Sequence, residues 1–502
     1  MNAETELKFQ VAPRKLASIL RSGSRGRDLS EQALVSSYYD TSKHKLKRNG
    51  LSLRVRKVEG RYVQTVKANG SSGSLTRGEW EHEVSGPKPD LKQASDTALE
   101  GVATKKLSHK LKPVFQTDVH RTAEVRRVRR SQIELAVDRG RIGAGRRSRP
   151  IAEIELELKS GQVADLFRLA RDIERKTDAE LDLRSKSERG YRLLAREGEG
   201  AQHAEPIRLK PELSPQDAFR VIARSTLRHI TTNADPLRNM DSEGVHQMRV
   251  GLRRLRAAIS LFDDILPRAS TGRIKAELKW LTDELAPARE IDVFLKESIQ
   301  PITEQDVPKR GSRAIRKTFS EQRVAAFRHA RDAVDLGRYR RLLIDAAEWI
   351  ETERPRTADD RTIAAYAAEV LDRRVKKARK QGKQLSDLDP RQRHKLRIRI
   401  KKIRYAVDFF ESLYRDSDRN ELAGFSARLK RIQSALGSLN DFMAHRELAI
   451  EAALAAPPAN RRAQAFAAGF IIGQEREAAQ DLIEHASKDL HRLRRLGVQP
   501  NK

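Results

Sequence analysis

Carboxylates alternate with apolar residues in two short segments of the sequence. In a strand, residues two apart share one face, so each segment would present a row of charges. The first row, in AETELKF, is Glu4, Glu6 and Lys8, and the second, in EIELELK, is Glu153, Glu155, Glu157 and Lys159. Hard carboxylate oxygens suit Mg²⁺ or Mn²⁺, which keep waters and substrate phosphates as their other ligands.

Basic residues alternate in the same way on two further candidate strands. Arg54 and Arg56 share a face in LSLRVR, and Lys67 ends QTVK. If these strands close into a barrel with the charged faces inward, carboxylates and cations line one interior. Such a site favours phosphoryl or nucleotidyl transfer, because a metal ion and guanidinium groups stabilise the charge that develops on the reacting phosphate. For any single strand, a solvent-exposed face would explain the same pattern.

The composition predicts a polyanionic partner. The chain of 502 residues has 101 Lys and Arg against 70 Asp and Glu, a formal net charge of +31. Nucleic acid, an anionic membrane, nucleotides and condensed phosphate all fit such an excess. The chain has no cysteine, which excludes disulfides, thiolate zinc sites and cysteine nucleophiles. We expect a cytoplasmic protein, since no signal sequence or long apolar run is visible.

The hydrophobic period divides the chain into two parts. Up to about residue 195 several segments alternate with period 2, which predicts an antiparallel sheet with helices near 12–22 and 162–177. The strand segments are 51–58, 61–68, 79–84, 133–138 and 151–159. REGEGAQHAEP (196–206) is typical of a linker, and beyond it the pattern is helical. The fold class is therefore α+β.

An internal repeat lies in the helical part. VHQMRVGLRRLRAAISLF (245–262) aligns without a gap on RHKLRIRIKKIRYAVDFF (393–410), which indicates a duplication into two units of about 140 residues. The two units are expected to pack as pseudo-symmetric partners. A fainter repeat relates LAPAREIDVFL (285–295) to LGSLNDFMAHREL (436–448).

Each copy carries a basic row beside its apolar stripe. Like charges three or four residues apart on a helix repel, and a bound polyanion would remove that cost. The first row is His246, Arg249, Arg253 and Arg256, and the second is His394, Arg397, Lys401 and Arg404. Either row alone would also fit a solvated helix face. Zinc binding is disfavoured because neither copy has an i, i+4 His pair. Capping is the expected role of Pro287, Arg289, Asp292, Asn440 and Asp441, and setting the turn or orienting the basic row is the alternative.

The N-terminal part resembles the CYTH domain of the triphosphate tunnel metalloenzymes over residues 1 to 196. The motifs that carry the resemblance are Glu4-x-Glu6-x-Lys8, YYDTSKHKLKRNGLSLRVRK (38–57), EIELELK and LRSKSERGY (183–191). The resemblance implies an eight-stranded antiparallel tunnel that hydrolyses or rearranges triphosphates with a divalent metal.

The resemblance also implies roles for individual residues. Glu4 and Glu6 would hold the metal, opposed by Glu153, Glu155 and Glu157, and Lys8 would contact substrate or orient the attacking water. The implied triphosphate contacts are Arg54, Arg56, Lys67, Arg121, Arg184 and Lys186. Arg77, Glu79 and Glu81 are either further tunnel residues or part of a solvent face.

The C-terminal part resembles the CHAD domain over residues 212 to 497, after a linker at 197–211. The resemblance, carried by H-x-x-R-V-x-x-R-R-L-R, its copy, REIDVFL and LNDF, implies two four-helix bundles (about 212–350 and 360–497) flanking a basic groove for inorganic polyphosphate. The implied contacts are the two basic rows together with Arg254 and Lys402. Aromatic residues make up only 5% of the chain, which disfavours stacking of single-stranded nucleic acid.

These observations predict an inorganic triphosphatase that depends on Mg²⁺ or Mn²⁺ and whose helical part binds polyphosphate. Adenylate cyclase chemistry is the rival on the same tunnel. Two further hypotheses are a polyphosphate-granule scaffold without activity and a nucleic-acid binder. The sequence leaves the oligomeric state open.

Overall fold

The computed structural model describes residues 2–21, 29–68, 76–94, 97–100, 102, 105–195, 200–304, 309–356, 360–383 and 385–493. Contacts within the chain define two compact units. The first contains Met1–His203 together with Arg224–Pro236 and Val334–Glu353, and the second contains Ala204–Ala223, Leu237–Ala333 and Arg354–Lys502. None of the described helices is long and apolar enough to cross a membrane.

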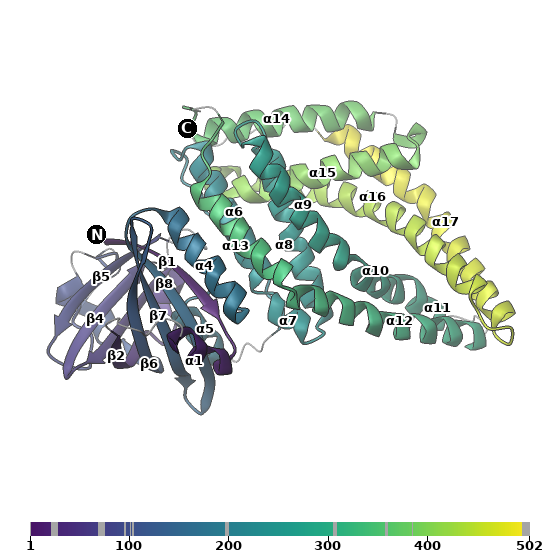
Figure 1. Ribbon diagram of the computed structural model, residues 1–502. Helices are drawn as coiled ribbons and strands as arrows, with labels where there is room; N and C mark the ends of the chain where they lie inside the picture. Colours follow the sequence, from purple (N-terminus) through teal and green to yellow (C-terminus); the bar gives the residue numbers. More distant parts are fainter. Residues whose placement is uncertain are drawn as a thin grey trace. The chain divides into compact units, whose positions relative to one another are not determined.

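The first unit is built on an antiparallel sheet that closes on itself (Figure 1). Hydrogen-bonded neighbours follow the order β5-β4-β3-β2-β6-β7-β8-β1, and β1 also pairs with β5, so eight strands form a ring as predicted. The short β9 adds to β1. The strands are β1 (Asn2–Gln10), β2 (Ser30–Asp40), β3 (Leu51–Val58), β4 (Arg61–Ala68), β5 (Thr76–Val84), β6 (Lys112–Val128), β7 (Ser131–Ala144), β8 (Arg147–Ser160) and β9 (Glu180–Leu181).

Apolar residues of the ring alternate with its charged rows and point to the opposite, outer face. On β1 and β8 this face carries Leu7, Phe9, Ile154 and Leu156, each at most 1% exposed. Helices α1 and α4 pack against these strands. The helices of this part are α1 (Pro13–Arg21), α2 (Lys45–Arg48), α3 (Lys105–Ser108), α4 (Val163–Thr177) and α5 (Lys186–Leu194). Burial of this outer layer holds the charged rows on the inner face.

Helix α5 packs against the inner face. Gly190 lies against the ring of Phe115, where a Cβ atom would come within 2.2 Å of it. Phe115 and Arg121 are six residues apart on β6 and therefore share a face. Tyr191 and Leu193 join Phe115, Tyr38 and Val119 in one apolar cluster. Hydrophobic packing thus fixes α5 beside the charged residues of the inner face.

A buried carboxylate shapes the turn that follows β2. Asp40 is fully buried, and its two oxygens accept hydrogen bonds from four donors. The donors are the amides of Thr41 (2.7 Å), Leu46 (2.9 Å) and Lys47 (3.0 Å) and the hydroxyl of Tyr191 (2.7 Å). The carboxylate therefore ties β2 to α2 and to α5.

We expect Asp40→Asn to lower the free energy of unfolding by about 2 kcal/mol, because an amide nitrogen would face hydrogen-bond donors in a buried site. Scanning calorimetry of the full chain measures this loss. Asp118→Asn is the matched control, since Asp118 is exposed and pairs with Arg141 at 3.5 Å across water-accessible surface. Equal unfolding temperatures for the two variants would contradict the prediction.

The remaining helices are α6 (Pro215–Thr231), α7 (Ala234–Arg238), α8 (Ser242–Leu261), α9 (Arg268–Glu284), α10 (Ala286–Phe294), α11 (Gln300–Glu304), α12 (Lys309–Asp335), α13 (Gly337–Thr352), α14 (Ile363–Gly382), α15 (Pro390–Phe410), α16 (Arg419–Leu454) and α17 (Arg461–Arg492). Short turns are η1 (Leu91–Ala94), the π-helix η2 (Leu295–Ile299), η3 (Leu385–Asp387), η4 (Glu411–Leu413) and η5 (Asp416–Asp418). Helix α14 packs on α15 and α17, and α16 packs on the same two helices. The predicted α+β class and helical C-terminal part are confirmed, while the linker and repeat bounds stay predictions.

Candidate functional site

The two acidic rows lie side by side on the inner face of the ring. In the β1–β8 register, Lys8 is opposite Glu155 and Glu6 is opposite Glu157. The ammonium of Lys8 lies 3.0 Å from Glu6 Oε1 and 3.1 Å from Glu155 Oε1. The strand pairing therefore joins the first motif to the second through one lysine.

Three carboxylates, which we call the acidic cluster, meet next to this lysine: Asp138 of β7 with Glu153 and Glu155 of β8. One oxygen from each lies within 4.8 Å of the other two. The ammonium of Lys186, at the start of α5, contacts all three, at 2.7 Å from Asp138 and 2.9 Å from Glu155. An all-oxygen donor set of this kind fits a hard divalent cation such as Mg²⁺ or Mn²⁺.

Cations hold Glu155 in its charged form. Burial alone would raise the pKa of this carboxyl, but Lys186, Lys8 and Arg121 together keep the pKa well below its usual range. Conversely, burial would lower the pKa of Lys186, and the three carboxylates of the acidic cluster raise it. Glu155 and Lys186 therefore both remain charged at neutral pH.

The predicted basic residues line other strands of the same face. Arg121 of β6 makes two hydrogen bonds of 2.7 Å to Asp138 and also contacts Glu155. On β3, Arg54 lies 3.4 Å from Glu79, and Arg56 donates to Ser36 at 2.9 Å. Burial and the neighbouring Arg54 and Arg121 lower the pKa of Arg56 to about 10. Arg121 lies on β6, which is not paired with β3. Its effect on the pKa of Arg56 is therefore expected if both side chains point into the ring.

Further residues complete this basic wall. Lys67 of β4 lies 2.6 Å from Glu79, and Glu81 accepts from Thr65 at 2.9 Å. Tyr38 of β2 is buried beside Arg54, and although burial alone would raise the pKa of its hydroxyl, nearby cations lower it. The structure thus brings Lys8, Glu6, Glu153, Glu155, Lys186 and Arg121 together, with Arg54 and Arg56 on β3 and Lys67 on β4 of the same ring.

Some predicted residues have other surroundings. Glu157 pairs with Lys159 at 2.7 Å. Arg184 pairs with Asp182 at 2.9 Å and points to that carboxylate instead of the acidic cluster. The backbone of Glu4 is opposite that of Arg77 where β1 and β5 close the ring, but the side chains of both lie outside the described residues. Asp138 was missed by sequence reasoning, although IELAVD places it on the inner face four residues after Glu134.

The duplicated helices α8 and α15 contact each other reciprocally in the second unit. Arg254 of α8 lies 3.7 Å from Asp408 of α15, and Lys402 of α15 donates to Ser260 of α8 at 2.9 Å. The gap-free alignment equates Arg254 with Lys402 and Ser260 with Asp408. Reciprocal contacts between equivalent positions are the signature of a two-fold relation. The two copies therefore meet about a pseudo-two-fold axis.

Four cations, which we call the central cation cluster, are grouped around Lys401 of α15: burial lowers its pKa, and so do Arg397 of α15 and Arg249 and Arg253 of α8. Burial, Arg397 and Arg253 lower the pKa of Lys401 to about 7. Burial and Arg253 lower the pKa of Arg249 to about 10, although Glu290 and Asp283 act in the opposite direction. Asp441 lies 3.7 Å from Arg397 and partly offsets the repulsion at Lys401. The cluster is therefore a positive site whose charge the nearby carboxylates Asp441, Glu290 and Asp283 offset in part.

The other predicted basic residues flank this cluster or face away from it. Burial and Arg289 lower the pKa of His246 to about 4, so this imidazole is neutral at pH 7. His394 contacts Asn440 at 2.6 Å. Arg254 and Arg404 both approach Asp408, Lys402 is bonded to Ser260, and Arg256 is exposed.

Among the expected capping residues, Asp292 instead binds Arg323 at 2.5 Å, and Pro287 occupies the first turn of α10.

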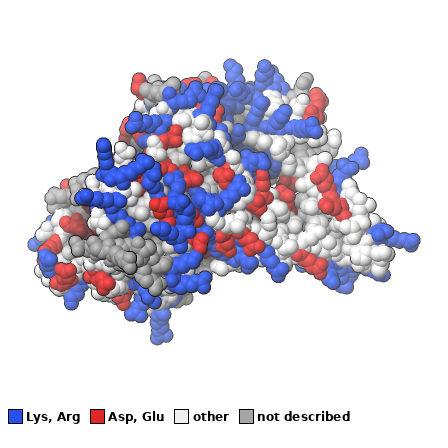
Figure 2. Space-filling view, viewed as in Figure 1, with Lys and Arg blue, Asp and Glu red and all other residues white. Residues whose placement is uncertain are grey.

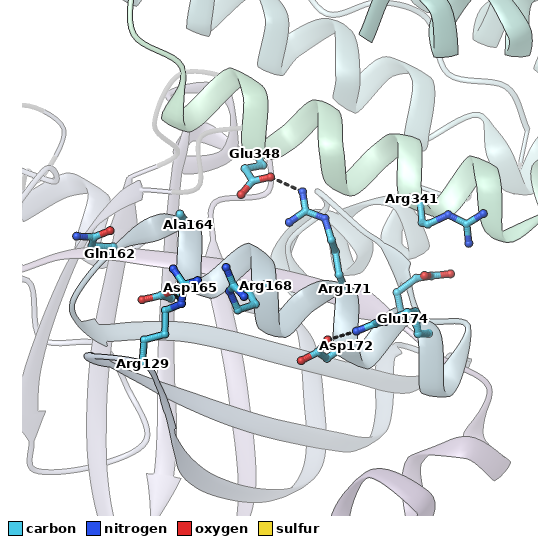
Figure 3. A pocket seen from close by; sticks show the side chains of 11 residues that line it. Arg129, Gln162, Ala164, Asp165, Arg168, Arg171, Asp172, Glu174, Arg341 and Glu348 are labelled. Atoms are coloured by element: carbon cyan, nitrogen blue, oxygen red, sulfur yellow. Dashed lines mark hydrogen bonds and ion pairs between the residues drawn. The ribbon is translucent and has the colours of Figure 1, made fainter. Parts of the chain in front are cut away.

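The surface by itself does not locate either site. Figure 2 shows Lys and Arg over much of the visible face, interspersed with Asp and Glu. A pocket of about 520 Å³ in the first unit is lined by helices α4 and α13 (Figure 3). Arg171 points across it to Glu348 and also binds Asp345 at 2.7 Å. Because five arginines there face four carboxylates, the pocket carries nearly balanced charge.

Two family models match the chain. The model of the CYTH domain matches residues 2–191, and the model of the CHAD domain matches residues 221–450. The chain therefore contains a CYTH domain followed by a CHAD domain, as the sequence motifs predicted.

Several individual proteins are similar to parts of the chain. An inorganic triphosphatase of Haemophilus influenzae is 32% identical over 197 residues, which are 38% of this chain and 55% of that protein. An uncharacterized protein of Mycobacterium tuberculosis is 26% identical over 259 residues, 50% of this chain and 48% of that one. The chain thus spans about half the length of the curated relatives it matches. The crystal structure of the CHAD domain from Ricinus communis is 28% identical with a TM-score of 0.52, covering 59% of this chain and 99% of that one.

Proposed function

We propose that the first unit hydrolyses inorganic triphosphate to pyrophosphate and orthophosphate with a divalent metal. The observation that carries the proposal is the inner face of the strand ring, which carries the acidic cluster, in contact with Arg121, together with Arg54, Arg56 and Lys67. Carboxylates for a metal and cations for phosphate oxygens on one face are what phosphoryl transfer requires. The similarity to an inorganic triphosphatase supports this substrate.

The acidic cluster and Glu6 are the residues that would hold the metal. A divalent cation held there would act as a Lewis acid and offset the charge that develops on the reacting phosphate. Arg54, Arg56, Lys67 and Arg121 bind the other phosphate oxygens. Lys8, held by Glu6 and Glu155, donates a hydrogen bond that orients water toward the terminal phosphorus. Addition of water breaks the bridging P–O bond and yields pyrophosphate, orthophosphate and a proton.

The central cation cluster of the second unit is proposed to bind inorganic polyphosphate. Its four cations share one small region, and Asp441 offsets only part of their charge at Lys401. A linear polyanion with closely spaced charges would relieve their mutual repulsion. The predicted cytoplasmic location and association with polyphosphate granules stay predictions.

The pKa of Lys401 makes polyphosphate binding dependent on pH. In the free protein the pKa is about 7, because burial, Arg397 and Arg253 oppose the charge and Asp441 only partly supports it. A bound polyanion favours the ammonium form and raises this pKa toward or beyond 10.5, its ordinary value. Above pH 7 the complex therefore binds more protons than the free protein. The affinity for polyphosphate falls as the pH rises from the pKa of Lys401 in the free protein to its pKa in the complex. Calorimetric titrations with polyphosphate at pH 8, in buffers of different ionisation enthalpy, should show that the protein takes up a proton on binding. Lys401→Arg should abolish this uptake. Binding without proton uptake by the wild type would contradict the prediction.

One assay tests the proposed hydrolysis. The full chain, freed of metal with a chelator, is given tripolyphosphate, longer polyphosphate or ATP, each with Mg²⁺ or Mn²⁺ restored. We expect phosphate release from tripolyphosphate with metal, and none without it. Cyclic AMP formation from ATP without phosphate release from tripolyphosphate would favour the cyclase hypothesis, and inactivity on all substrates would favour the scaffold.

A further inference from the structure

Helix α5 brings the most enclosed cation of the described inner face into the acidic cluster. Lys186 is the first residue of α5 and is 8% exposed. Its neighbour one turn further on, Arg189, also contacts Glu153. The position of the first turn of α5 therefore decides which cations neutralise the carboxylates of the acidic cluster.

The chain on either side of Lys186 is held by residues from far along the sequence. Two residues after Lys186, Glu188 Oε1 lies 2.8 Å from Arg228 Nη2. Two residues before it, Arg184 Nη2 lies 3.4 Å from Asp235 Oδ2. Arg228 and Asp235 belong to Arg224–Pro236, a segment that contacts assign to the first unit. Both contacts are therefore internal to the unit that carries the acidic cluster.

Each contact acts on a group that shapes the start of α5. Glu188 closes a capping box with Ser185: its Oε2 accepts from the Ser185 amide at 2.7 Å, and the Ser185 hydroxyl accepts from the Glu188 amide at 3.1 Å. Arg228 binds the other oxygen of the same carboxylate. A capping box fixes the first turn of a helix, and a cation on its carboxylate limits the rotamers of Glu188.

Arg184 links Asp235 to the first strand. Its guanidinium binds Asp182, whose carboxylate also accepts from Gln10 at 2.5 Å. The amide of Asp182 donates to the carbonyl oxygen of Lys8 at 2.8 Å. Asp235 thus fixes a segment that is bonded directly to the strand carrying Lys8.

We propose that Arg228 and Asp235, which lie in the region matched by the CHAD model, are positioning residues for Lys186 in the acidic cluster of the CYTH domain. The inference rests on the proposed triphosphatase function. Arg228 and Asp235 each act through a neighbour of Lys186 in the sequence, Glu188 or Arg184. The CYTH domain is accordingly not self-sufficient: part of its site is held in place by the following domain's sequence.

Activity of the full chain tests this role. We expect Arg228→Gln with Asp235→Asn to lower kcat/KM for tripolyphosphate about tenfold, the loss typical when a supporting charged contact is removed. Arg228→Lys should recover part of this loss, since it keeps the charge. Arg220→Gln, on the same helix but paired with Asp217, is the matched control and should remain within about twofold of the wild type.

A mutant cycle separates positioning of Lys186 from a general loss of structure. In a Lys186→Gln background, adding Arg228→Gln and Asp235→Asn should change kcat/KM by less than about twofold, because residues acting through one group are not additive. Full additivity of the two losses in that background, or wild-type activity of the folded Arg228/Asp235 double variant, would overturn the proposal.

A second readout does not depend on activity. Hydrogen exchange of the amides of 186–194 should accelerate in the Arg228/Asp235 double variant and not in Arg220→Gln. Unchanged exchange in the double variant would also overturn the positioning role. If the wild type fails to hydrolyse tripolyphosphate, the proposed function fails, whereas accelerated exchange would still support the structural inference.

Discussion

Glu155→Gln should lower kcat for tripolyphosphate hydrolysis by at least about 100-fold. Glu155 is the carboxylate shared by Lys8 at 3.1 Å, Lys186 at 2.9 Å and Arg121. A glutamine keeps the shape but carries no charge, so three buried cations would lose their common counter-ion and a metal would lose one ligand. Steady-state phosphate release at saturating Mg²⁺ or Mn²⁺ measures the effect.

Glu31→Gln is the matched control for this experiment. Glu31 lies on β2 of the same ring, its side chain is 66% exposed, and its partner His120 is 3.8 Å away. We expect activity within about twofold of the wild type, since exposed ion pairs contribute little. Isothermal titration with metal should show weaker binding only for Glu155→Gln. Near-wild-type activity of Glu155→Gln would refute the assignment of the acidic cluster as the reaction site.

Replacing two members of the central cation cluster, Arg253→Gln with Lys401→Gln, should weaken binding of long-chain polyphosphate about 30-fold at about 0.15 M salt. Loss of two phosphate contacts should also reduce the slope of log K against log salt by about 1.4, by analogy with single-stranded nucleic acid. Fluorescence anisotropy with labelled polyphosphate over a range of salt concentrations measures both quantities.

The unbound protein provides a further check on the same pair of substitutions. Because the two cations repel their neighbours, their removal should leave the unfolding temperature unchanged or slightly higher. Lys395→Gln with Arg399→Gln removes the same net charge from an exposed face of α15 and should alter affinity less than about threefold. Equal losses of affinity in the two double variants would mean that net charge alone drives binding.

The two-residue period identified β3 and β4 with their observed bounds, Leu51–Val58 and Arg61–Ala68. It also found the charged rows of β1 and β8, because one face of each strand is apolar and the other is charged. It missed β2 and β6 as strands, and the reason is visible in β2. Tyr38 and Tyr39 are both buried, one in each of two apolar clusters on opposite faces, so no alternation is visible there.

Strand register explains why part of the candidate site could not be predicted from the sequence. Asp138 stands in a strand dominated by apolar residues, and only the pairing of β6, β7 and β8 places it opposite Arg121 and Glu153. Arg184 and Lys186 are two residues apart in one motif, yet the turn into α5 directs Lys186 to the acidic cluster and Arg184 to Asp182.

The sequence alone determined the residue types of both sites, the division into a strand part and a helical part, and the duplication of the basic helix. These properties are local: they follow from the period of apolar residues and from the charges placed between them. Tertiary structure alone decided that Asp138 joins Glu153 and Glu155, that four members of the two basic rows gather in the central cation cluster, and that Arg228 and Asp235 hold the start of α5. Each of these depends on contacts between residues far apart in the chain, and strand register, helix packing and buried ion pairs set those contacts.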